Sequence, residues 1–313
     1  MTAVIERTRP AAARRVLAPQ RREALWFYLM ASPWIVGFVV LTLGPVIVSI
    51  WLSMTDWDLF TEPEFVGPDN YVRLFTADPV FWKVLGNTAF YAFLSVPLGM
   101  AASLGVAYLL NKPLRLIRLF RTAVYLPTLV PLVATSILFV WMFAPDTGLI
   151  NSFLGLFGVD GPEWLLDADW VKPALIIMSL WQIGTAVLLL LAGMQSVPRH
   201  LYEAAALDGA GPGRQFWHIT MPMLTPVIFF NLVMGIIGAF QVFSQIYIMT
   251  EGGPDNASQM VVPLLFQHAF KFNHMGYASA IAWVLFLIMM LLTLVVIRSS
   301  SMWVFYESEV KRK

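Results

Sequence analysis

Long apolar runs, separated by shorter polar connectors, fill most of this 313-residue chain. Each run has the roughly 20 residues that a helix needs to cross the ~30 Å hydrocarbon core of a bilayer. The six runs are Phe27–Leu52, Gly86–Leu110, Thr122–Phe143, Pro173–Val197, Met223–Ile248 and Ala278–Ile297. The pattern predicts an all-α, polytopic membrane protein with six transmembrane helices. Residues 1–26 form a basic tail, residues 27–297 the membrane domain and residues 298–313 a second tail.

The composition agrees with this class. Hydrophobic residues make up 58% of the chain and charged residues 12%, whereas soluble domains carry about 25% charged residues. None of the 20 basic and 19 acidic residues falls inside the six runs. Proton-driven carriers and voltage sensors keep ionisable groups at membrane depth. The lack of such groups in the runs argues against a carrier that powers itself.

Basic residues concentrate in alternate connectors, which predicts the orientation. The two tails, Asn111–Arg121 and Pro198–Pro222 together hold 16 basic and 6 acidic residues, a net charge of +10. The other connectors hold 4 basic and 13 acidic residues, a net charge of −9. Because Lys and Arg favour the cytoplasmic side of a membrane, we expect both termini and the connector Pro198–Pro222 to be cytoplasmic.

The usual signatures of metal and nucleotide chemistry are missing. The chain has no cysteine, and none of its 4 histidines stands in an H-E-x-x-H pattern. No G-x-x-x-x-G-K-[ST] loop occurs to hold the phosphates of a nucleotide. We therefore expect neither a metal site nor an enzymatic centre, and we expect a partner to supply the energy.

The connector PRHLYEAAALDGAGPGRQFWHITMP (Pro198–Pro222) has more structure than a simple link requires. Pro198 suits the first position of a helix, and Gly209 suits its left-handed end. Pro212 can begin a second short helix, and Pro222 begins the next apolar run. Two short helices joined by glycines predict a surface that binds a partner.

This connector resembles the EAA loop of permease subunits in binding-protein-dependent ABC importers. The resemblance rests on Glu203-Ala204-Ala205, Gly209 and the segment Ile219–Pro222, in which Met221 replaces the usual Leu. Further segments resemble the carbohydrate branch related to maltose and glycerol-3-phosphate permeases, and the likeness runs from about Trp26 to the last span. These segments are Phe120–Phe143, Gly148–Gly155, Leu191–Pro198, Met249–Ser258 and Met275–Phe286.

The resemblance implies that the first helix of the loop, which lies between the fourth and fifth spans, docks in a cleft of a cytoplasmic ATPase. Glu203 is then the anionic contact, Ala204 and Ala205 allow close approach, and Gly209 permits the turn. Asp208, Ile219 and Pro222 belong to the same coupling site. The simpler interpretation is that Glu203 and Asp208 are surface charges, Glu203 also complementing the helix dipole. Tyr202 and Phe216 either pack in the cleft or rest on the membrane interface.

The resemblance also implies the partners and the location. These are a second, homologous permease in a heterodimer, two ATPase subunits that use ATP and Mg, and an extracytoplasmic solute-binding protein. The expected location is the cytoplasmic membrane of a prokaryote, in contact with lipid. We expect no directly bound cofactor and no nucleic acid. The outer connectors Ser53–Leu85, Ala144–Lys172 and Met249–Tyr277 are long enough to receive a solute receptor.

Two outer features have alternative interpretations. The segment Gly148–Phe157 is expected to form a short helix on the outer surface. Trp164 and Trp170 are either anchors at the membrane interface or contacts to the receptor.

Sugars are bound by aromatic faces and by neutral hydrogen-bonding groups, so the candidate path residues are uncharged. At 100° per residue, Gln241, Ser244 and Gln245 share one face of the fifth span. Its flanks carry Phe240 and Tyr247, the fourth span offers Trp181 and Gln182, and the second offers Asn87 and Tyr91. The alternative is that these polar side chains only link helices to one another.

Two classes of function remain open at this point. The first is a permease subunit for a sugar, with glycerol-3-phosphate or another polyol-type solute as the alternative cargo. The second is a stand-alone carrier or channel that works without ATP. The docking loop and the absence of charges in the spans both favour the first class.

Overall fold

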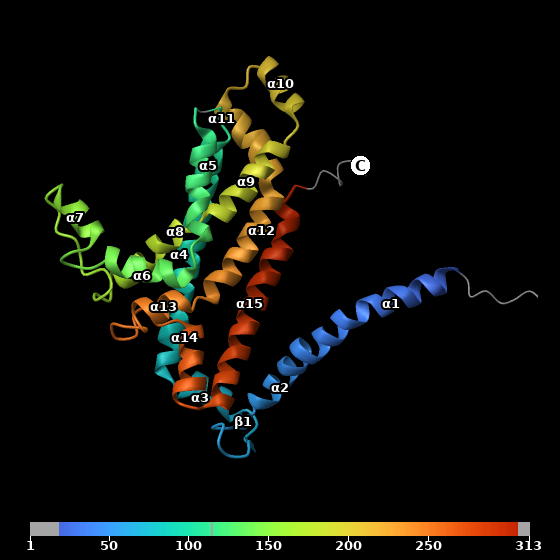
Figure 1. The fold of residues 1–313 in the computed structure, drawn as a ribbon, viewed down its shortest axis with the longest axis vertical. Coiled ribbons are helices and arrows are strands. Elements are labelled where there is room, and N and C mark those ends of the chain that lie inside the picture. Colours follow the sequence, from blue (N-terminus) through green and yellow to red (C-terminus); the bar gives the residue numbers. More distant parts are fainter. Residues whose placement is uncertain (1–18, 114, 306–313) are drawn as a thin grey trace, which may run out of the picture. The chain divides into compact units, whose positions relative to one another are not determined.

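The computed structural model describes residues 19–113 and 115–305, and their regular structure is almost entirely helical (Figure 1). Four helices are long and apolar enough to cross a membrane, or six if each of two bent helix pairs counts as one span. This agrees with the six predicted spans. The first 18 residues of the predicted N-terminal tail and residues 306–313 of the second tail lie outside the described residues. The first helix already begins at Pro19, inside the predicted tail.

The chain divides into two compact units, residues 1–51 and 52–313, which are described separately. The first predicted span consists of α1 (Pro19–Phe38), the π-helical turn η1 (Val39–Leu43) and α2 (Gly44–Leu52). The N–H of Gly44 bonds to the carbonyl of Val39, five residues earlier. Pro45 follows at once and has no N–H to continue the regular ladder, so the wide turn lies where the helix must adjust.

The second unit opens with a small hairpin, β1 (Thr55–Asp56) paired antiparallel with β2 (Glu64–Phe65), followed by α3 (Asp69–Thr76). The amide of Asn70 anchors α3, since Nδ2 donates to the carbonyls of Ser53 at 3.0 Å and Thr55 at 2.8 Å. The long helix α4 (Pro79–Leu110) then begins under the cap of Asp78. This carboxylate accepts from the N–H groups of Val80 and Phe81, two donors that the helix itself cannot satisfy.

Three of the predicted spans are broken rather than continuous. The third consists of α5 (Ile117–Tyr125), the 3₁₀ turn η2 (Leu126–Leu129) and α6 (Leu132–Met142), with a bend of 99°. The fourth consists of α8 (Val171–Trp181) and α9 (Gly184–Ser196), bent by 48°. The fifth consists of α12 (Met221–Phe240) and α13 (Ser244–Met249). Broken helices survive at membrane depth only where protein or a water-filled cavity satisfies the freed backbone groups.

The remaining elements complete the unit. They are α7 (Leu149–Gly155), α10 (Arg199–Leu207), α11 (Pro212–Gln215), the π-helical turn η3 (Phe216–Thr220), α14 (Val261–Phe266), the π-helical turn η4 (Gln267–Lys271) and α15 (Met275–Trp303). In Figure 1, α10 and α11 lie at one end of the bundle, and α3 and α14 lie at the other. The predicted docking loop and two of the outer connectors, those that contain α3 and α14, therefore occupy opposite ends of this unit.

Two hydrophobic clusters hold the bundle together. The larger joins the first half of α4 to α6, α8, α13, α14 and α15, and the smaller joins the end of α4 to α9 and α12. A Cβ at Gly193 would lie 2.7 Å from Cδ2 of Leu224, so this glycine lets α9 and α12 approach closely. Along α4 the fully buried residues of the two clusters are separated by the stretch from Ser95 to Ser103, and this gap contains the cavity described below.

The short helix predicted within Gly148–Phe157 is present as α7. It belongs to the segment 144–170, which projects to the side of the bundle (Figure 1). Trp164 is neither an interface anchor nor a free contact, because it is buried. Its Nε1 donates to Oδ1 of Asn151 at 2.6 Å, and its ring packs against Phe143. Trp170 packs edge-on against Trp164 and stays partly exposed.

Candidate functional site

The docking loop, residues 198–222, contains the two short helices that the sequence predicts. Helix α10 ends in a Schellman motif, in which the N–H of Gly209 bonds to the carbonyl of Ala206 at 3.0 Å. The N–H of Ala210 bonds to the carbonyl of Ala205 at 2.8 Å. Gly209 has φ of 78°, a left-handed conformation that confirms the expected turn. We expected Pro198 to be the first residue of this helix. It is instead the N-cap, and Arg199 is the first helical residue.

The second half of the loop differs from the prediction. Pro212 begins α11, as expected, but α11 continues through η3 into α12 without a break. Pro222 is therefore the second residue of α12 in a continuous helical stretch and does not begin a separate helix. The wide turn η3 directly precedes Pro222, and the N–H of Met221 bonds to the carbonyl of Phe216. As at Pro45, the missing N–H of a proline coincides with a π-helical turn.

Side-chain contacts hold the loop rigid. The hydroxyls of Tyr202 and Thr220 lie 2.9 Å apart and join α10 to η3. Nε2 of Gln215 donates to the carbonyl of Ala210 at 2.9 Å. Phe216 packs edge-on against Tyr108 of α4, with ring centroids 5.0 Å apart. Tyr202 and Phe216 thus serve the loop itself, an interpretation that the sequence did not suggest.

The proposed coupling residues present a mixed surface. Glu203, Ala204, Asp208 and Gly209 are exposed, while Ala205, Ile219 and Pro222 are half-buried. The next residue of α10, Leu207, is 91% exposed. Leu207 lies one turn after Glu203 and Ala204, so these three residues share the exposed face of α10.

A second site lies inside the bundle, where the broken helices meet. This central cavity has a volume of about 490 Å³ and is lined by α4, by both sides of the α8–α9 and α12–α13 breaks, and by Leu132 of α6. All of its lining residues are uncharged. Its polar lining residues are Tyr91, Ser95, Ser103, Ser179, Gln182, Asn231, Gln241, Ser244 and Gln245.

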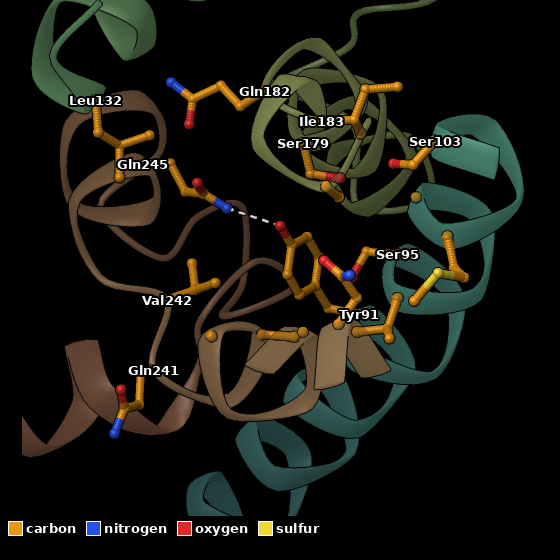
Figure 2. A pocket seen from close by; sticks show the side chains of 18 of the residues that line it. Tyr91, Ser95, Ser103, Leu132, Ser179, Gln182, Ile183, Gln241, Val242 and Gln245 are labelled. Carbon is orange, nitrogen blue, oxygen red and sulfur yellow. Dashed lines mark hydrogen bonds between the residues drawn. The ribbon is translucent and has the colours of Figure 1, made fainter. Parts of the chain in front are cut away.

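Two hydrogen bonds shape the wall of this cavity. Nε2 of Gln245 on α13 donates to the hydroxyl of Tyr91 on α4 at 2.9 Å, and both residues are buried (Figure 2). Nε2 of Gln182, at the α8–α9 break, donates to the hydroxyl of Thr135 on α6 at 3.3 Å. Gln241 is exposed and lies apart from the Tyr91–Gln245 pair in Figure 2. The cavity thus offers neutral donors and acceptors, which suits an uncharged polar ligand.

Five of the nine predicted path residues line this cavity: Tyr91, Gln182, Gln241, Ser244 and Gln245. The fifth span brings its three to the cavity through the break between α12 and α13 and not through one continuous helix face. The structure therefore differs from the helical-face argument, because the helix stops at Phe240.

The other four predicted path residues lie elsewhere. Asn87 is buried, and its Nδ2 donates to the carbonyls of Asn256 and Gln259 at 2.8 and 3.1 Å. Phe240 is buried and borders a separate apolar pocket between α4, α12 and α15. Trp181 packs edge-on against Phe139, and Tyr247 stacks on Phe243.

The sequence reasoning missed the contribution of α4 to the cavity. Ser95, Gly99 and Ser103 all line it, as do Ser179, Asn231 and Gly235 from the facing helices. A spacing of four residues between Ser95, Gly99 and Ser103 is a signal that could have found this face. Within residues 19–113 and 115–305, His, Asp and Glu side chains nowhere gather in a group of three that could hold a metal ion.

With this geometry in place, a comparison with known proteins defines the family. Residues 95–302 match the family described as the binding-protein-dependent transport system inner membrane component. The chain belongs to this family. It is therefore an inner-membrane component of such a transport system, as its apolar helices require.

Individual relatives agree with this assignment. The chain is 41% identical over 293 residues to the probable ABC transporter permease protein YesP of Bacillus subtilis, covering 92% of this chain and 94% of that one. It is 36% identical to the lactose transport system permease protein LacF of Rhizobium radiobacter, covering 85% and 91%. Its fold matches a chain from the crystal structure of a bacterial alginate ABC importer with a TM-score of 0.80 at 24% identity, covering 90% and 97%.

Proposed function

We propose that this chain is the permease subunit of an ATP-driven sugar importer and forms half of the path through which the sugar crosses the membrane. The observation that carries this proposal is the uncharged central cavity, lined by amides and hydroxyls from α4 and from the breaks of two spans, α8–α9 and α12–α13. Membrane proteins expose unwound backbone and neutral polar side chains at membrane depth where a solute or water passes. Because the chain belongs to a family of transport components, we interpret this cavity as part of the path for the solute.

The chemistry of the cavity favours a neutral sugar. Sugars are held by hydrogen bonds from uncharged groups, and the wall offers hydroxyls, amides and the ring of Tyr91. A phosphorylated solute such as glycerol-3-phosphate needs a nearby cation, and none of the lining residues is Lys, Arg or His. The lactose permease LacF is named for a neutral disaccharide, which supports the same choice. We therefore place a neutral mono- or oligosaccharide ahead of glycerol-3-phosphate.

We assign the other steps of transport, which are energy supply, the second half of the path and delivery of the sugar, to partner proteins. Energy comes from two ATPase subunits that use ATP and Mg and that bind the exposed face of α10. A second, homologous permease supplies the other half of the path. A solute-binding protein delivers the sugar at the opposite end, near α3 and α14. The charge distribution among the connectors supports a cytoplasmic position for both termini and α10.

The docking role of α10 can be tested with a matched pair of double variants. Glu203→Ala with Gly209→Ala removes the exposed acid and forces a left-handed residue to carry a Cβ, which costs about 1–2 kcal/mol. The control is Glu163→Ala with Gly158→Ala, because Gly158 has φ of 72° and, like Gly209, open space around it. The control thus carries the same chemical change far from α10.

We expect the α10 variant to lose uptake and nucleotide-dependent binding of the ATPase subunits, while the receptor's affinity for its sugar is unchanged. The control variant should keep its nucleotide-dependent binding of the ATPase subunits. Uptake is measured in cells, and ATPase association by co-purification through a tag on this chain. Normal transport by the α10 variant would count against the docking role.

A further inference from the structure

One face of α4 follows the central cavity over a long distance. Tyr91, Ser95, Gly99 and Ser103 are spaced by four residues and all line the cavity. From Tyr91 to Ser103 this face extends about 18 Å along the helix axis. At the Tyr91 end it is closed by the hydrogen bond to Gln245. Its other end is directed toward Leu110, the end of α4.

Ser103, at the far end of this face, has a hydroxyl without a partner. The residue is fully buried, and Oγ makes no hydrogen bond. Serines elsewhere in the helices bond back to the backbone, as Ser136 does to the carbonyl of Leu132 and Ser279 to that of Met275. A buried polar group left unpaired costs free energy. In Figure 2 the Ser103 hydroxyl is directed from α4 toward the α8–α9 helices, on the side of the cavity where a solute would satisfy it.

The space beside Gly99, one turn before Ser103, is open. A Cβ at Gly99 would meet nothing within 4 Å, although Gly99 lines the cavity and faces other helices. Across the cavity, α12 contributes Gly235 and Asn231, four residues apart on one helical face. Gly235 packs closely against α4, since a Cβ there would lie 3.2 Å from Cγ1 of Val96, so the open room at this level lies beside Gly99.

We propose that the face of α4 from Ser95 to Ser103 forms the inner part of the solute passage, between the Tyr91–Gln245 pair and the end of the bundle that carries α10. Ser103 supplies a hydrogen-bonding hydroxyl to a neutral polyhydroxy solute there, and Gly99 leaves the room through which the solute moves. The inference rests on the proposed function, because it takes the central cavity as the path.

The test uses the absence of cysteine from the chain. Ser103→Cys is introduced into the full transporter in membrane vesicles and treated with the neutral, hydroxyl-bearing reagent 2-hydroxyethyl methanethiosulfonate. The matched control is Ser136→Cys, which is equally buried but bonded to its own helix and outside the cavity. We expect the thiol at position 103 to react about tenfold faster or more, since reactivity follows access.

A second pair of variants tests the passage itself. Gly99→Leu, added to Ser103→Cys, should fill the open space and slow the labelling about tenfold. The control is Gly105→Leu, on the same helix, where a Cβ also meets nothing but the residue is outside the cavity lining. Slowing by both leucines, or by neither, would overturn the passage along Gly99.

Ser244→Cys, at a half-buried position in the cavity wall, separates failure of this inference from failure of the proposed function. If position 244 is labelled and position 103 reacts as slowly as position 136, the cavity is wet but the inner passage is not along α4, and only this inference fails. If neither position 244 nor position 103 is labelled, the cavity is not a solute path, and the proposed function fails as well.

Discussion

Single buried polar side chains on α4 join it to distant segments. Asn87 donates to the carbonyls of Asn256 and Gln259, and Oγ1 of Thr88 accepts from the N–H of Val261 at 3.1 Å. One turn further along, Tyr91 accepts from Gln245. Hydrogen bonds between membrane helices contribute about 0.6 kcal/mol each on average. Their larger effect is to fix which residues face one another around the cavity.

The pKa of His268, at the opposite end of the bundle from α10, is shifted by the surroundings of the side chain. Burial is the main reason that its pKa lies below the usual value. The carboxylate of Asp78 opposes this shift, whereas His274 and Arg73 add to it. Nδ1 of His268 is buried without a hydrogen-bond partner. Its ring packs against Tyr277, whose hydroxyl donates to Oδ2 of Asp78 at 2.6 Å.

The sign of the pH dependence follows directly. The folded protein favours neutral His268, while an unfolded histidine takes up a proton near pH 6.5. Below about pH 6.5, and down to the lowered pKa, the unfolded state therefore binds more protons, and stability falls as the pH falls.

We expect the thermal midpoint in detergent to drop on acidification from about pH 7.5 to about pH 5.5, and to drop less in His268→Gln than in the wild type. His200→Gln, on the exposed helix α10, is the control and should behave like the wild type. An unchanged pH profile in His268→Gln would contradict this assignment.

At the scale of elements, Asn151 organises the projecting segment 144–170. Its Nδ2 donates to the carbonyls of Pro145 and Pro162 at 3.0 and 3.2 Å, and its Oδ1 accepts from Trp164. A side chain at Gly161 would collide with Asn151, so the two residues are matched. One asparagine thus holds together a segment that has little regular structure of its own.

Replacing Asn151 with Ala should loosen this segment. The change removes three hydrogen bonds and leaves the buried indole N–H of Trp164 without an acceptor, which costs about 1–3 kcal/mol. We expect limited proteolysis within residues 144–170 to become faster, while the rest of the chain stays protected. Ser152→Ala, which removes one side-chain bond to Gly148, is the control. Equal cleavage of Asn151→Ala and wild type would show that the segment is held by other contacts.

At the scale of the whole molecule, charge is distributed unevenly between the two sets of connectors. The four basic residues of the proposed outer connectors are engaged with neutral groups of the chain. Arg73 lies over the ring of Tyr277, Lys83 donates to the carbonyl of Asp255, Lys172 donates to Asn87, and Lys271 lies over the ring of Tyr247. These four residues keep their charge, but 13 acidic residues outnumber them, so the outer connectors carry a net charge of −9. Such a face favours a receptor whose docking surface is positively charged.

The cysteine-free chain also allows a direct test of the proposed orientation. Leu207→Cys on α10 and Phe157→Cys after α7 are both strongly exposed, at 91% and 71%. We expect a membrane-impermeant maleimide to label position 157 in intact cells, and position 207 only after the membrane is opened. The reverse pattern would place α10 outside and would contradict ATPase docking there.

Much of the membrane architecture and the docking loop could be predicted because these features depend on nearby residues. Whether a segment enters a bilayer depends on its own apolar content, and the loop's glycine and prolines act within a few positions. The continuity of the spans could be predicted only in part. Pro131 disfavours a helical conformation at Val130 and so signals the break in the third span, whereas nothing local in Gln241–Phe243 signals the end of α12.

Composition and local backbone preference are sufficient to specify six membrane spans and a glycine-jointed docking loop, because both depend on residues close together in the chain. Which polar side chains meet at the cavity depends instead on tertiary packing. Asn87 binds a segment 169 residues away, whereas Ser103 lines the cavity with a buried, unpaired hydroxyl. These contacts depend on packing between helices that are distant in the chain, and the hydrophobic periodicity of a single helix does not predict such packing.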